Sequence, residues 1–271
     1  MTVSGTRGPF DFRFDVRDDG VAILTLDRPD SLNSLTFAIY GQLERLFLDL
    51  EHDSAVKAIV LTGAGKGFCS GGNVDDIIGA LFAADTADTL RFTRMTGAVV
   101  RNMLRLSKPI VAAINGTAAG AGTVLALACD LRVLSTAASF AFLFTKVGLT
   151  GADMGAAWLL PRIVGMGRAS ELLLLGDKLH AEDCARIGLA NRVVAPERLL
   201  DEALALAARL AAGPALAQAM TKRLLVNEAA MDLEAAIEHE AQAQALLLRC
   251  ADHREFFAAW QEKRPPRFAG R

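Results

Sequence analysis

The chain has 271 residues, 52% of them hydrophobic, and its 29 basic and 31 acidic side chains give a formal net charge of −2. A chain of this length forms one large domain, or one domain with an appendage, and can fill a sizeable apolar core. The slightly negative charge argues against nucleic acid as the main partner. No apolar run approaches the roughly 18 residues of a membrane-spanning helix.

Cysteine and histidine spacing predicts no metal site. The four cysteines lie far apart without a metal-binding or CxxC pattern, and the four histidines form no HExxH motif. The first nine residues contain no apolar stretch of signal-peptide length. We therefore expect reduced thiols in a cytoplasmic protein that binds neither a metal nor a membrane.

The first two thirds of the chain alternate between strand-like and helix-like patterns. Alternating residues at 10–16 and an apolar run at 21–26 flank the turn Asp18-Asp19-Gly20, which predicts a hairpin. The further elements expected, in chain order, are a helix at 34–50, a strand at 56–61, helices at 74–81 and 89–106, a strand at 110–114, a helix at 122–128 and a strand at 131–134. This rhythm indicates an α/β fold with parallel strand pairing.

The composition changes near residue 195. From 196 to 260 the pattern is almost entirely helical, with breaks expected at Gly213-Pro214 and Met231-Asp232, and the prolines of the tail exclude a helix there. We predict two parts, a core over 1–195 and a helical lid or oligomerisation region over 196–271. The ordinary reading of any single leucine-rich face is plain core packing.

Two glycine-rich segments, 63–72 and 115–122, each follow an apolar strand. Glycine lets a backbone turn tightly and lets a ligand approach its N–H groups. Two such loops can aim two amides at one anionic oxygen, as in an oxyanion hole. The first segment lacks the Gly-Lys-Ser/Thr ending of a P-loop and the Rossmann spacing, and Ser70 does not lie in a Gly-x-Ser-x-Gly elbow.

Further motifs accompany these loops in a fixed order, and together they resemble the crotonase (enoyl-CoA hydratase/isomerase) superfamily along nearly the whole chain. The matching pieces are Leu26-Asp-Arg-Pro29, Leu32-Asn33-Ser-Leu35, Gly67 to Gly72, Lys108-Pro109 through Gly122, Ala128-Cys-Asp130, Leu160-Pro-Arg162 and Glu262-Lys-Arg264. The resemblance implies a spiral of β-β-α turns, trimers or dimers of trimers, and acyl-CoA thioester substrates. It implies no cofactor other than the coenzyme A of the substrate.

The resemblance also assigns binding positions. The two oxyanion amides fall on Gly72 and Ala121, where each N–H donor to an enolate typically contributes about 3–4 kcal/mol, and a helix starting at Ala121 adds its dipole. Where many relatives carry a basic residue, this chain has Asp30-Ser31. The coenzyme A positions implied are Arg28, Ser31, Leu32, Lys66, Phe68 and Ser70, with Lys263 adding charge from a neighbouring subunit.

The chain departs from the family's hydratases at both catalytic glutamates. The matching positions hold Val124 and Phe144, which cannot transfer protons. One acid remains nearby, Asp153, at a position where dienoyl-CoA isomerases use an aspartate for proton transfer and 4-chlorobenzoyl-CoA dehalogenases use it as a nucleophile. Dehalogenation also requires a histidine in the pocket, and no histidine occurs between residues 53 and 179.

Two roles for Asp153 stay open at this point. Apolar neighbours would raise its pKa and suit it to acid–base work. Asp153 also stands where the cap of a helix over 154–163 belongs, and both roles can hold together. Asp75 and Asp76, which follow the first loop, fit a solvated helix start better than a catalytic role.

These observations predict an acyl-CoA enzyme of the enoyl-CoA hydratase/isomerase type, with Asp153 as the proton-transfer residue. An apolar pocket for an aromatic or alicyclic acyl group would be formed by Ile77, Met95, Val124, Phe144 and Trp158. The alternatives are a non-catalytic acyl-CoA binder, an isomerase or hydrolase that uses Asp153, and a nucleotide-binding α/β protein. The sequence leaves hydration, isomerisation and thioester hydrolysis open.

Overall fold

The computed structural model describes residues 3–6 and 8–270, and its centre is a seven-stranded sheet in the order β1-β2-β3-β4-β6-β8-β11. The first three strands pair antiparallel, and the predicted hairpin is the β2–β3 pair. From β3 onward every pair is parallel, with Leu24 opposite Leu61 and Val60 opposite Val111. The strands are β1 (Val3–Thr6), β2 (Arg13–Arg17), β3 (Val21–Leu26), β4 (Ala58–Gly63), β6 (Ile110–Ile114), β8 (Leu131–Ser135) and β11 (Arg192–Val194).

A second sheet of four short strands has the order β10-β9-β7-β5. Its members are β5 (Gly67–Cys69), β7 (Thr117–Ala119), β9 (Ser139–Ala141) and β10 (Lys178–His180). Strands β4, β6 and β8 of the large sheet are each followed in the chain by one strand of the small sheet, β5, β7 and β9. The predicted spiral of β-β-α turns in an α/β fold is therefore confirmed.

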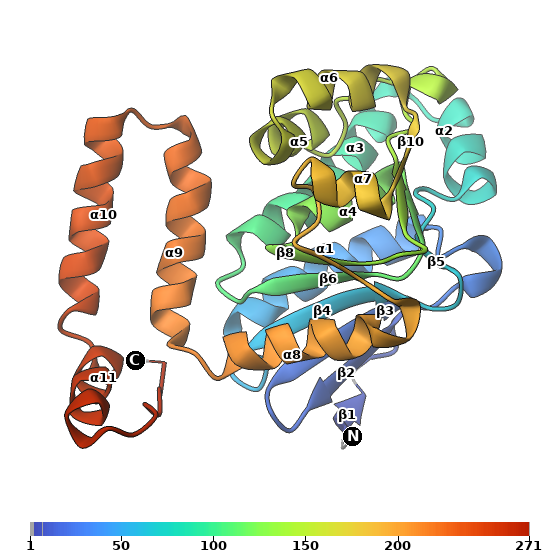
Figure 1. Ribbon diagram of the computed structural model, residues 1–271. Coiled ribbons are helices and arrows are strands. Elements are labelled where there is room, and N and C mark those ends of the chain that lie inside the picture. Colours follow the sequence, from blue (N-terminus) through green and yellow to red (C-terminus); the bar gives the residue numbers. More distant parts are fainter. Residues whose placement is uncertain (1–2, 7, 271) are drawn as a thin grey trace.

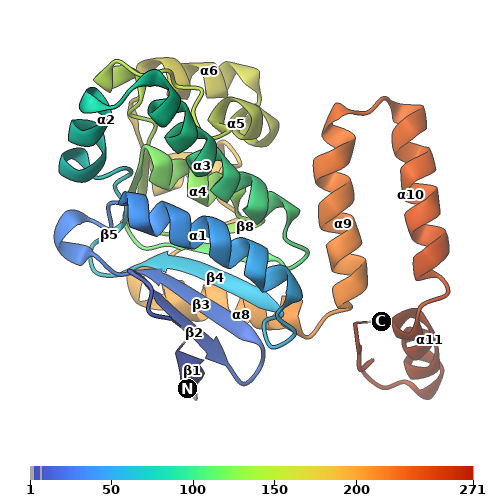
Figure 2. The same ribbon diagram turned by 180° about the vertical axis from the view of Figure 1, so that it is seen from behind.

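Helices cover both faces of the large sheet (Figures 1 and 2). One face, with Leu24, Ile59 and Ala112, packs in the main core with α1 (Phe37–Asp49), α3 (Thr86–Arg105) and α4 (Ala121–Ala128). The other face, with Val60 and Val111, is covered by α8 (Leu199–Ala211). Both faces of β6 are buried, which explains its unbroken Ile-Val-Ala-Ala-Ile run.

The remaining helices surround the small sheet or leave the core. They include η3 (Val74–Ile78), α2 (Gly79–Ala83), η4 (Thr145–Val147), α5 (Ala156–Val164), α6 (Met166–Leu175), α7 (Ala181–Arg186), α9 (Ala215–Asn227), α10 (Leu233–Leu247) and α11 (Ala251–Glu262), and the short helical turns elsewhere are η1 (Pro29–Ser31), η2 (Leu50–His52), η5 (Pro196–Arg198) and η6 (Glu228–Ala230). Both predicted breaks in the C-terminal helices are confirmed. Since α8 packs on the sheet, the part that extends away is α9 to α11 (Figures 1 and 2). The division at residue 195 itself stays a prediction.

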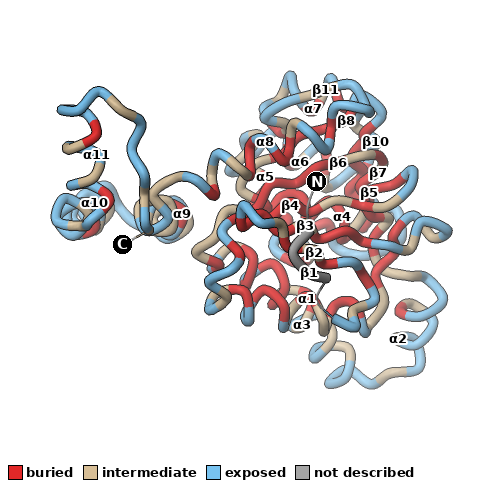
Figure 3. The backbone as a smooth tube through the Cα atoms, turned by 90° about the horizontal axis from the view of Figure 1, so that it is seen from below, coloured by how far each residue is buried: buried red, intermediate tan, exposed pale blue. Residues whose placement is uncertain are grey.

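Helix α9 is fastened to the core by one buried ammonium. Lys222, 8% exposed, donates to Asp130 Oδ2 at 2.8 Å and to the Lys108 carbonyl oxygen at 3.1 Å. The same carboxylate oxygen accepts from the Ile110 amide at 2.7 Å, so the contact ties α9 to the start of β6. Beyond this anchor, α10 and α11 are mostly exposed (Figure 3).

Within the described part of the chain, no single helix is long and apolar enough to cross a membrane. The bent pair Pro196–Ala211 and Ala215–Ala230, at 107° to each other, passes a test of length and composition alone. The first segment of that pair contains α8, whose apolar face is buried against the sheet.

Candidate active site

The two glycine-rich loops interlock backbone against backbone. A Cβ added to Gly116 would overlap the Lys66 carbonyl oxygen, and one added to Gly122 would overlap the Cys69 carbonyl and lie 2.8 Å from the Cys69 Cβ. These glycines therefore serve the close packing of one loop on the other, rather than the approach of a ligand.

Two asparagine side chains fasten the loops further. Asn33 donates to the carbonyl oxygens of Ala64 and Gly67 at 2.9 and 2.8 Å, and Asn115 donates to Gly67 at 3.0 Å. Both residues lie in motifs that carry the family resemblance, but their role in holding the first loop was missed. Asn115 opens the second glycine-rich segment, whereas Asn33 lies far before the first, so no local pattern marks its role.

Each loop leaves one backbone amide without a partner in the described part of the protein. The Gly71 carbonyl oxygen accepts a hydrogen bond from the Leu35 amide at 2.8 Å, and the Asn73 amide donates to the Leu35 carbonyl oxygen. The N–H of Gly72, which lies between these two residues, takes no part in the bridge. Ala121 is the first residue of α4. Among the described residues, neither Gly72 nor Ala121 donates its N–H to a protein oxygen.

The start of α4 lies close to the residue that precedes Gly72. A Cβ on Gly71 would lie 3.4 Å from the Ala121 nitrogen, which places the second loop directly beside the first. Every residue of α4 is buried, so the dipole at its start is little screened by water. Two unpaired N–H groups at such a helix start are suited to bind one anionic oxygen.

Asp153 occupies a left-handed turn just before α5. Met154 has φ +50° and Gly155 has φ +95°, and Met154 is a non-glycine residue held in this strained region. The helix begins at Ala156 with Gly155 as its N-cap and no side-chain cap bond, so the capping expectation for Asp153 is wrong. Burial raises the pKa of the Asp153 carboxyl, and the Met154 amide opposes this shift in part.

One further titratable group, Tyr40, lies within electrostatic range of this carboxylate, and Cys69 lies near Tyr40. Burial holds the pKa of Tyr40 well above its usual range, and the nearby Cys69 thiol and Asp153 carboxylate raise it further. Burial raises the pKa of Cys69 to about 12, so its thiol stays neutral beside the first loop. The site thus combines unpaired amides with one carboxylate that accepts a proton more readily than an ordinary aspartate.

The residues predicted for the acyl pocket are distributed over several elements. Ile77 touches the first loop, since its Cδ1 lies 3.5 Å from a Cβ built on Gly72. Val124 lies in α4 and Phe144 just before η4, and both are buried. Met95 lies against α1, while Trp158 stacks on the Arg162 guanidinium at 4.0 Å and lines a groove of 430 Å³ between α3, α5 and α9.

Most residues predicted for coenzyme A form one connected strip beside the first loop. Ser70 donates its amide to the Leu32 carbonyl at 2.9 Å and its hydroxyl to the Ser31 carbonyl at 3.0 Å. The Ser31 hydroxyl in turn donates to the Arg28 carbonyl at 3.2 Å. Leu32 and Lys66 are exposed and available to a ligand.

Two of the predicted coenzyme A positions lie apart from this strip. The Phe68 side chain is wholly buried in the core, which leaves only its backbone for a ligand. Lys263 follows α11, far from β5 and the loops of its own chain (Figure 1). Lys263 can therefore reach a coenzyme A site only in a neighbouring copy of the chain, as the family resemblance implies.

Other polar groups near the loops have structural partners. The Asp76 carboxylate accepts a hydrogen bond from the Phe37 amide at the start of α1, and Asn73 caps η3. Both contacts agree with a place for Asp76 at a helix start rather than with a catalytic role. In residues 3–6 and 8–270, no group of three or more histidine, cysteine, aspartate or glutamate side chains is placed to hold a metal ion.

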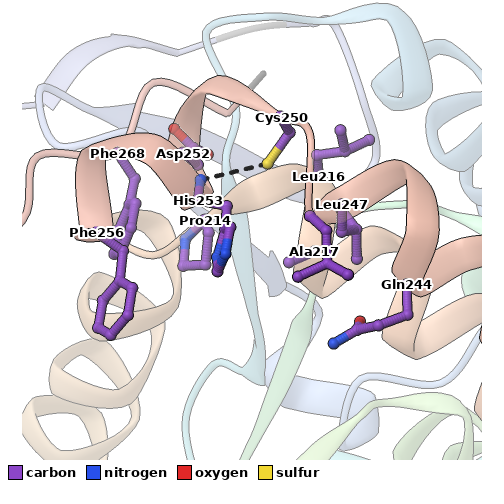
Figure 4. Close-up of a pocket in the computed structure, with 11 residues that line it drawn as sticks. Pro214, Leu216, Ala217, Gln244, Leu247, Cys250, Asp252, His253, Phe256 and Phe268 are labelled. Carbon is purple, nitrogen blue, oxygen red and sulfur yellow. Dashed lines mark hydrogen bonds between the residues drawn. The ribbon is translucent and has the colours of Figure 1, made fainter. Parts of the chain in front are cut away.

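A separate pocket of 250 Å³ lies between α9, α10, α11 and the C-terminal tail (Figure 4). The Asp252 carboxylate accepts from the Ala269 and Gly270 amides at 2.6 and 2.9 Å, which folds the tail back on α11. The Cys250 sulfur accepts from the His253 amide at the start of the helix. This pocket is a product of tail packing and lies apart from the paired loops.

Comparison with known proteins gives one consistent family. The family model described as enoyl-CoA hydratase/isomerase matches residues 16–271. The 1,2-epoxyphenylacetyl-CoA isomerase of Escherichia coli K12 is 37% identical over 94% of this chain and 97% of its own length. The short-chain-enoyl-CoA hydratase of Clostridium acetobutylicum is 30% identical over 92% of this chain and 94% of its own.

Solved structures agree with this comparison. The crystal structure of a proposed enoyl-CoA hydratase from Streptomyces coelicolor A3(2) superposes with a TM-score of 0.95 at 52% identity, covering 100% of this chain and 99% of the other. The enoyl-CoA hydratase of Bacillus anthracis superposes with a TM-score of 0.90 at 29% identity, covering 96% and 100%.

Proposed function

Because the chain belongs to the enoyl-CoA hydratase/isomerase family of the crotonase superfamily and is an enzyme of that type acting on acyl-CoA, we propose that its reaction is an isomerisation through a thioester enolate. The observations that carry the proposal are one partly buried carboxylate with a raised pKa, Asp153, two loop amides without a described protein partner, and apolar residues at both glutamate positions. An isomerisation needs one group that removes a proton and returns it to another carbon. Hydration by the family's usual route needs a second acid, which Val124 and Phe144 do not supply.

In the proposed step, the thioester oxygen accepts hydrogen bonds from the Gly72 and Ala121 amides. The Asp153 carboxylate takes a proton from the acyl chain, and the C–H electron pair moves into the enolate. The protonated Asp153 then returns the proton to a different carbon of the conjugated system, so no atom is gained or lost. Burial favours this exchange because it brings the basicity of the carboxylate closer to that of the reacting carbon acid.

The relatives support an isomerase in part. The E. coli protein, named for an acyl-CoA isomerisation, resembles this chain over nearly its whole length. Several other relatives are named as hydratases, so hydration is the second candidate function. It would require water activated by Asp153 alone.

The rest of the site follows from the same proposal. The strip of Arg28, Ser31, Leu32, Lys66, Ser70 and the Phe68 backbone would hold coenzyme A, with Lys263 supplied by a neighbouring subunit of a trimer or a dimer of trimers. Ile77, Met95, Val124, Phe144 and Trp158 would surround the acyl group. No bound cofactor is expected beyond the coenzyme A of the substrate, and the cytoplasmic location stays a prediction.

Proton transfer at Asp153 is tested by deuterium incorporation. The enzyme is incubated in deuterated water with a panel of unsaturated acyl-CoA thioesters, and label and double-bond position are read by mass spectrometry and NMR. Asp153→Asn is expected to lower turnover about 10²–10⁴-fold, the usual contribution of a general acid–base group. Val124→Ala, which removes no proton-transferring group, serves as the matched control for a changed pocket.

The outcomes separate the rival functions. Isomerised, labelled product that depends on Asp153 supports the proposal, and added oxygen in the product points to hydration instead. Release of free coenzyme A indicates thioester hydrolysis. Tight binding without turnover or label across the panel would mean a binding protein, and full activity of Asp153→Asn would remove this residue from the chemistry.

A further inference from the structure

Arg132 places a charged side chain inside the main core. It lies in β8 opposite Ala112 of β6, and therefore on the face of the large sheet that packs with α4. Leu134, the next residue of β8 on that face, is apolar and buried, and Arg132 itself is only 7% exposed. A buried guanidinium carries a desolvation cost that an apolar side chain of similar size avoids. Packing alone therefore does not explain the charge at this position.

The guanidinium lies at the C-terminal end of α4. Its Nη1 donates to the Cys129 carbonyl oxygen at 2.7 Å, and its Nε donates to the Leu189 carbonyl oxygen at 2.8 Å. Cys129 is the C-cap of α4. Burial lowers the pKa of Arg132, and the nearby Cys129 and Asp130 oppose this shift, but a guanidinium stays protonated in proteins. A full positive charge thus touches the negative pole of this helix.

The charges near this end of α4 do not cancel. The Asp130 carboxylate accepts from the Lys222 ammonium at 2.8 Å, so it already has a cation of its own. The described partners of the Arg132 guanidinium are backbone carbonyl oxygens, which are neutral. One positive charge is therefore in excess at the C-terminal end of the helix. Since every residue of α4 is buried, water screens this charge little along the helix.

The other end of α4 carries the Ala121 amide of the candidate oxyanion hole. Its 8 residues, at a rise of about 1.5 Å each, make a helix about 12 Å long. A unit charge at about this distance, in the effective dielectric of a protein, changes an equilibrium that creates a second charge about three- to tenfold. A cation that neutralises the negative pole leaves the positive potential at the N-terminal end larger.

We propose that Arg132 acts through α4 on the thioester oxygen, because its charge strengthens the positive potential at the Ala121 amide and so polarises the carbonyl of a bound acyl-CoA. Arg132 is a positioning residue rather than a catalytic one, since it acts through the helix. The inference rests on the proposed function only in taking the Gly72 and Ala121 amides as the site of the thioester oxygen. It holds for any reaction that passes through an enolate.

The test observes the carbonyl directly. Butanoyl-CoA, isotope-labelled at the thioester carbonyl carbon, is bound to the enzyme, and the infrared stretching frequency of its C=O bond is compared with that of the free thioester. The wild type is expected to lower this frequency, because two N–H donors polarise the bond. Arg132→Met, which removes the charge and keeps an unbranched side chain, is expected to lower it less.

Turnover gives a second readout. For any thioester that the wild type converts, Arg132→Met is expected to lower kcat about three- to tenfold and to leave KM nearly unchanged, because the charge on the oxygen grows in the transition state. A purely structural role would not produce this split together with a changed carbonyl frequency.

Three further variants separate charge from packing. Arg132→Lys keeps the charge and is expected to keep most of the frequency shift, whereas Arg132→Gln keeps a donor without the charge and should behave like Arg132→Met. Asn191→Ala removes the acceptor of the Arg132 backbone amide, a bond of 2.7 Å, and changes no charge, so the shift should stay at the wild-type value. Circular dichroism and thermal unfolding establish that each variant is folded, and Arg132→Gln replaces Arg132→Met if the latter does not fold.

A smaller shift in the neutral variants that Arg132→Lys restores would support the inference. An unchanged shift in the neutral variants would overturn it, as would an equally large loss in Arg132→Lys or in Asn191→Ala. No shift in the wild type would overturn it together with the oxyanion role of the two loops. Failure of the isomerase proposal is seen separately, in the deuterium labelling with Asp153→Asn, because butanoyl-CoA has no double bond to isomerise.

Discussion

A carboxyl group whose ionised form is disfavoured by burial reduces the stability of the fold at neutral pH. Burial raises the pKa of Asp153 above its ordinary value of 3.8, so the folded state binds this proton more tightly than the unfolded chain. The stability that the proton confers is fully present below pH 3.8 and is lost as the pH rises through the higher folded pKa. Above that window, the folded state carries the cost of a desolvated charge.

We therefore expect Asp153→Asn to be more stable than the wild type at pH 7, although it is less active. The difference is expected to shrink as the pH is lowered towards the ordinary pKa of aspartate, because both proteins then carry a neutral side chain. Urea unfolding at pH 7 and near pH 4 measures it. Asp18→Asn, in an exposed turn, should stay within about 0.5 kcal/mol of the wild type at both values.

Equal stability of Asp153→Asn and the wild type at pH 7 would contradict the raised pKa. It would also remove the argument that Asp153 is a stronger base than an ordinary aspartate. Such a trade of stability for function is common where a catalytic group is desolvated.

At this same scale, the sequence predicted some site residues and missed others. Gly72, Ala121 and Asp153 could be singled out because they fall within ordered motifs, and their roles stay predictions; the structure places the Ala121 nitrogen close to Gly71, the residue before Gly72. The hydrogen bonds with which Asn33 and Asn115 hold the first loop were missed. Which carbonyl oxygens these amides meet depends on how segments far apart in the sequence approach in three dimensions, and no local pattern carries that information.

At the scale of elements, the long strands and helices were predictable and the small sheet was not. Strand β6 was predicted over the residues it occupies, because its whole length is apolar and buried on both faces. Strands β5, β7 and β9 have three residues each, Gly-Phe-Cys, Thr-Ala-Ala and Ser-Phe-Ala, and are too short for a period to show. They form through pairing with one another, which only the tertiary structure reveals.

The close approach of β5 to α4 depends on Gly122. We expect Gly122→Ala to destabilise the fold by about 3 kcal/mol, the upper part of the usual cost of overpacking, because the new Cβ meets the Cys69 backbone. It should also lower turnover, since it pushes apart the loops that carry the Gly72 and Ala121 amides. Chemical unfolding and steady-state kinetics measure the two effects.

Gly97→Ala is the matched control for that substitution. Gly97 lies inside α3, and a Cβ there meets nothing within 4 Å. Alanine is expected to stabilise the helix by about 0.5–1 kcal/mol. A stable and fully active Gly122→Ala enzyme would show that the loops can separate without loss, against the role given to their contact.

At the scale of the whole molecule, the core and the C-terminal helices differ in how completely they bury apolar surface. The core encloses both faces of the large sheet, whereas α10 and α11 leave Ile237 50% exposed and Trp260 68% exposed. Large exposed apolar groups gathered on one part of a protein mark an interaction surface. Lys263, next to this surface, is also too far from its own loops to reach a ligand there.

A trimer in which α10 and α11 contact a neighbouring copy accounts for both facts, and we expect the wild type to be trimeric or hexameric. Changing Ile237 and Trp260 to glutamate places charges in that contact and is expected to give monomers, measured by light scattering after gel filtration. Leu48→Glu, an exposed apolar position on α1, is the control and should keep the assembly.

The same experiment connects assembly to the active site. If a neighbouring copy supplies Lys263, the monomeric variant should bind coenzyme A more weakly, and Lys263→Ala should weaken binding in the intact assembly without dissociating it. The effect should fall at higher salt, because it depends on a solvent-exposed charge meeting a phosphate. A monomeric wild type, or a monomeric variant with unchanged affinity for coenzyme A, would mean that each chain completes its own site. The exposed face of α10 and α11 would then need a different partner, because its apolar side chains remain uncovered in the single chain.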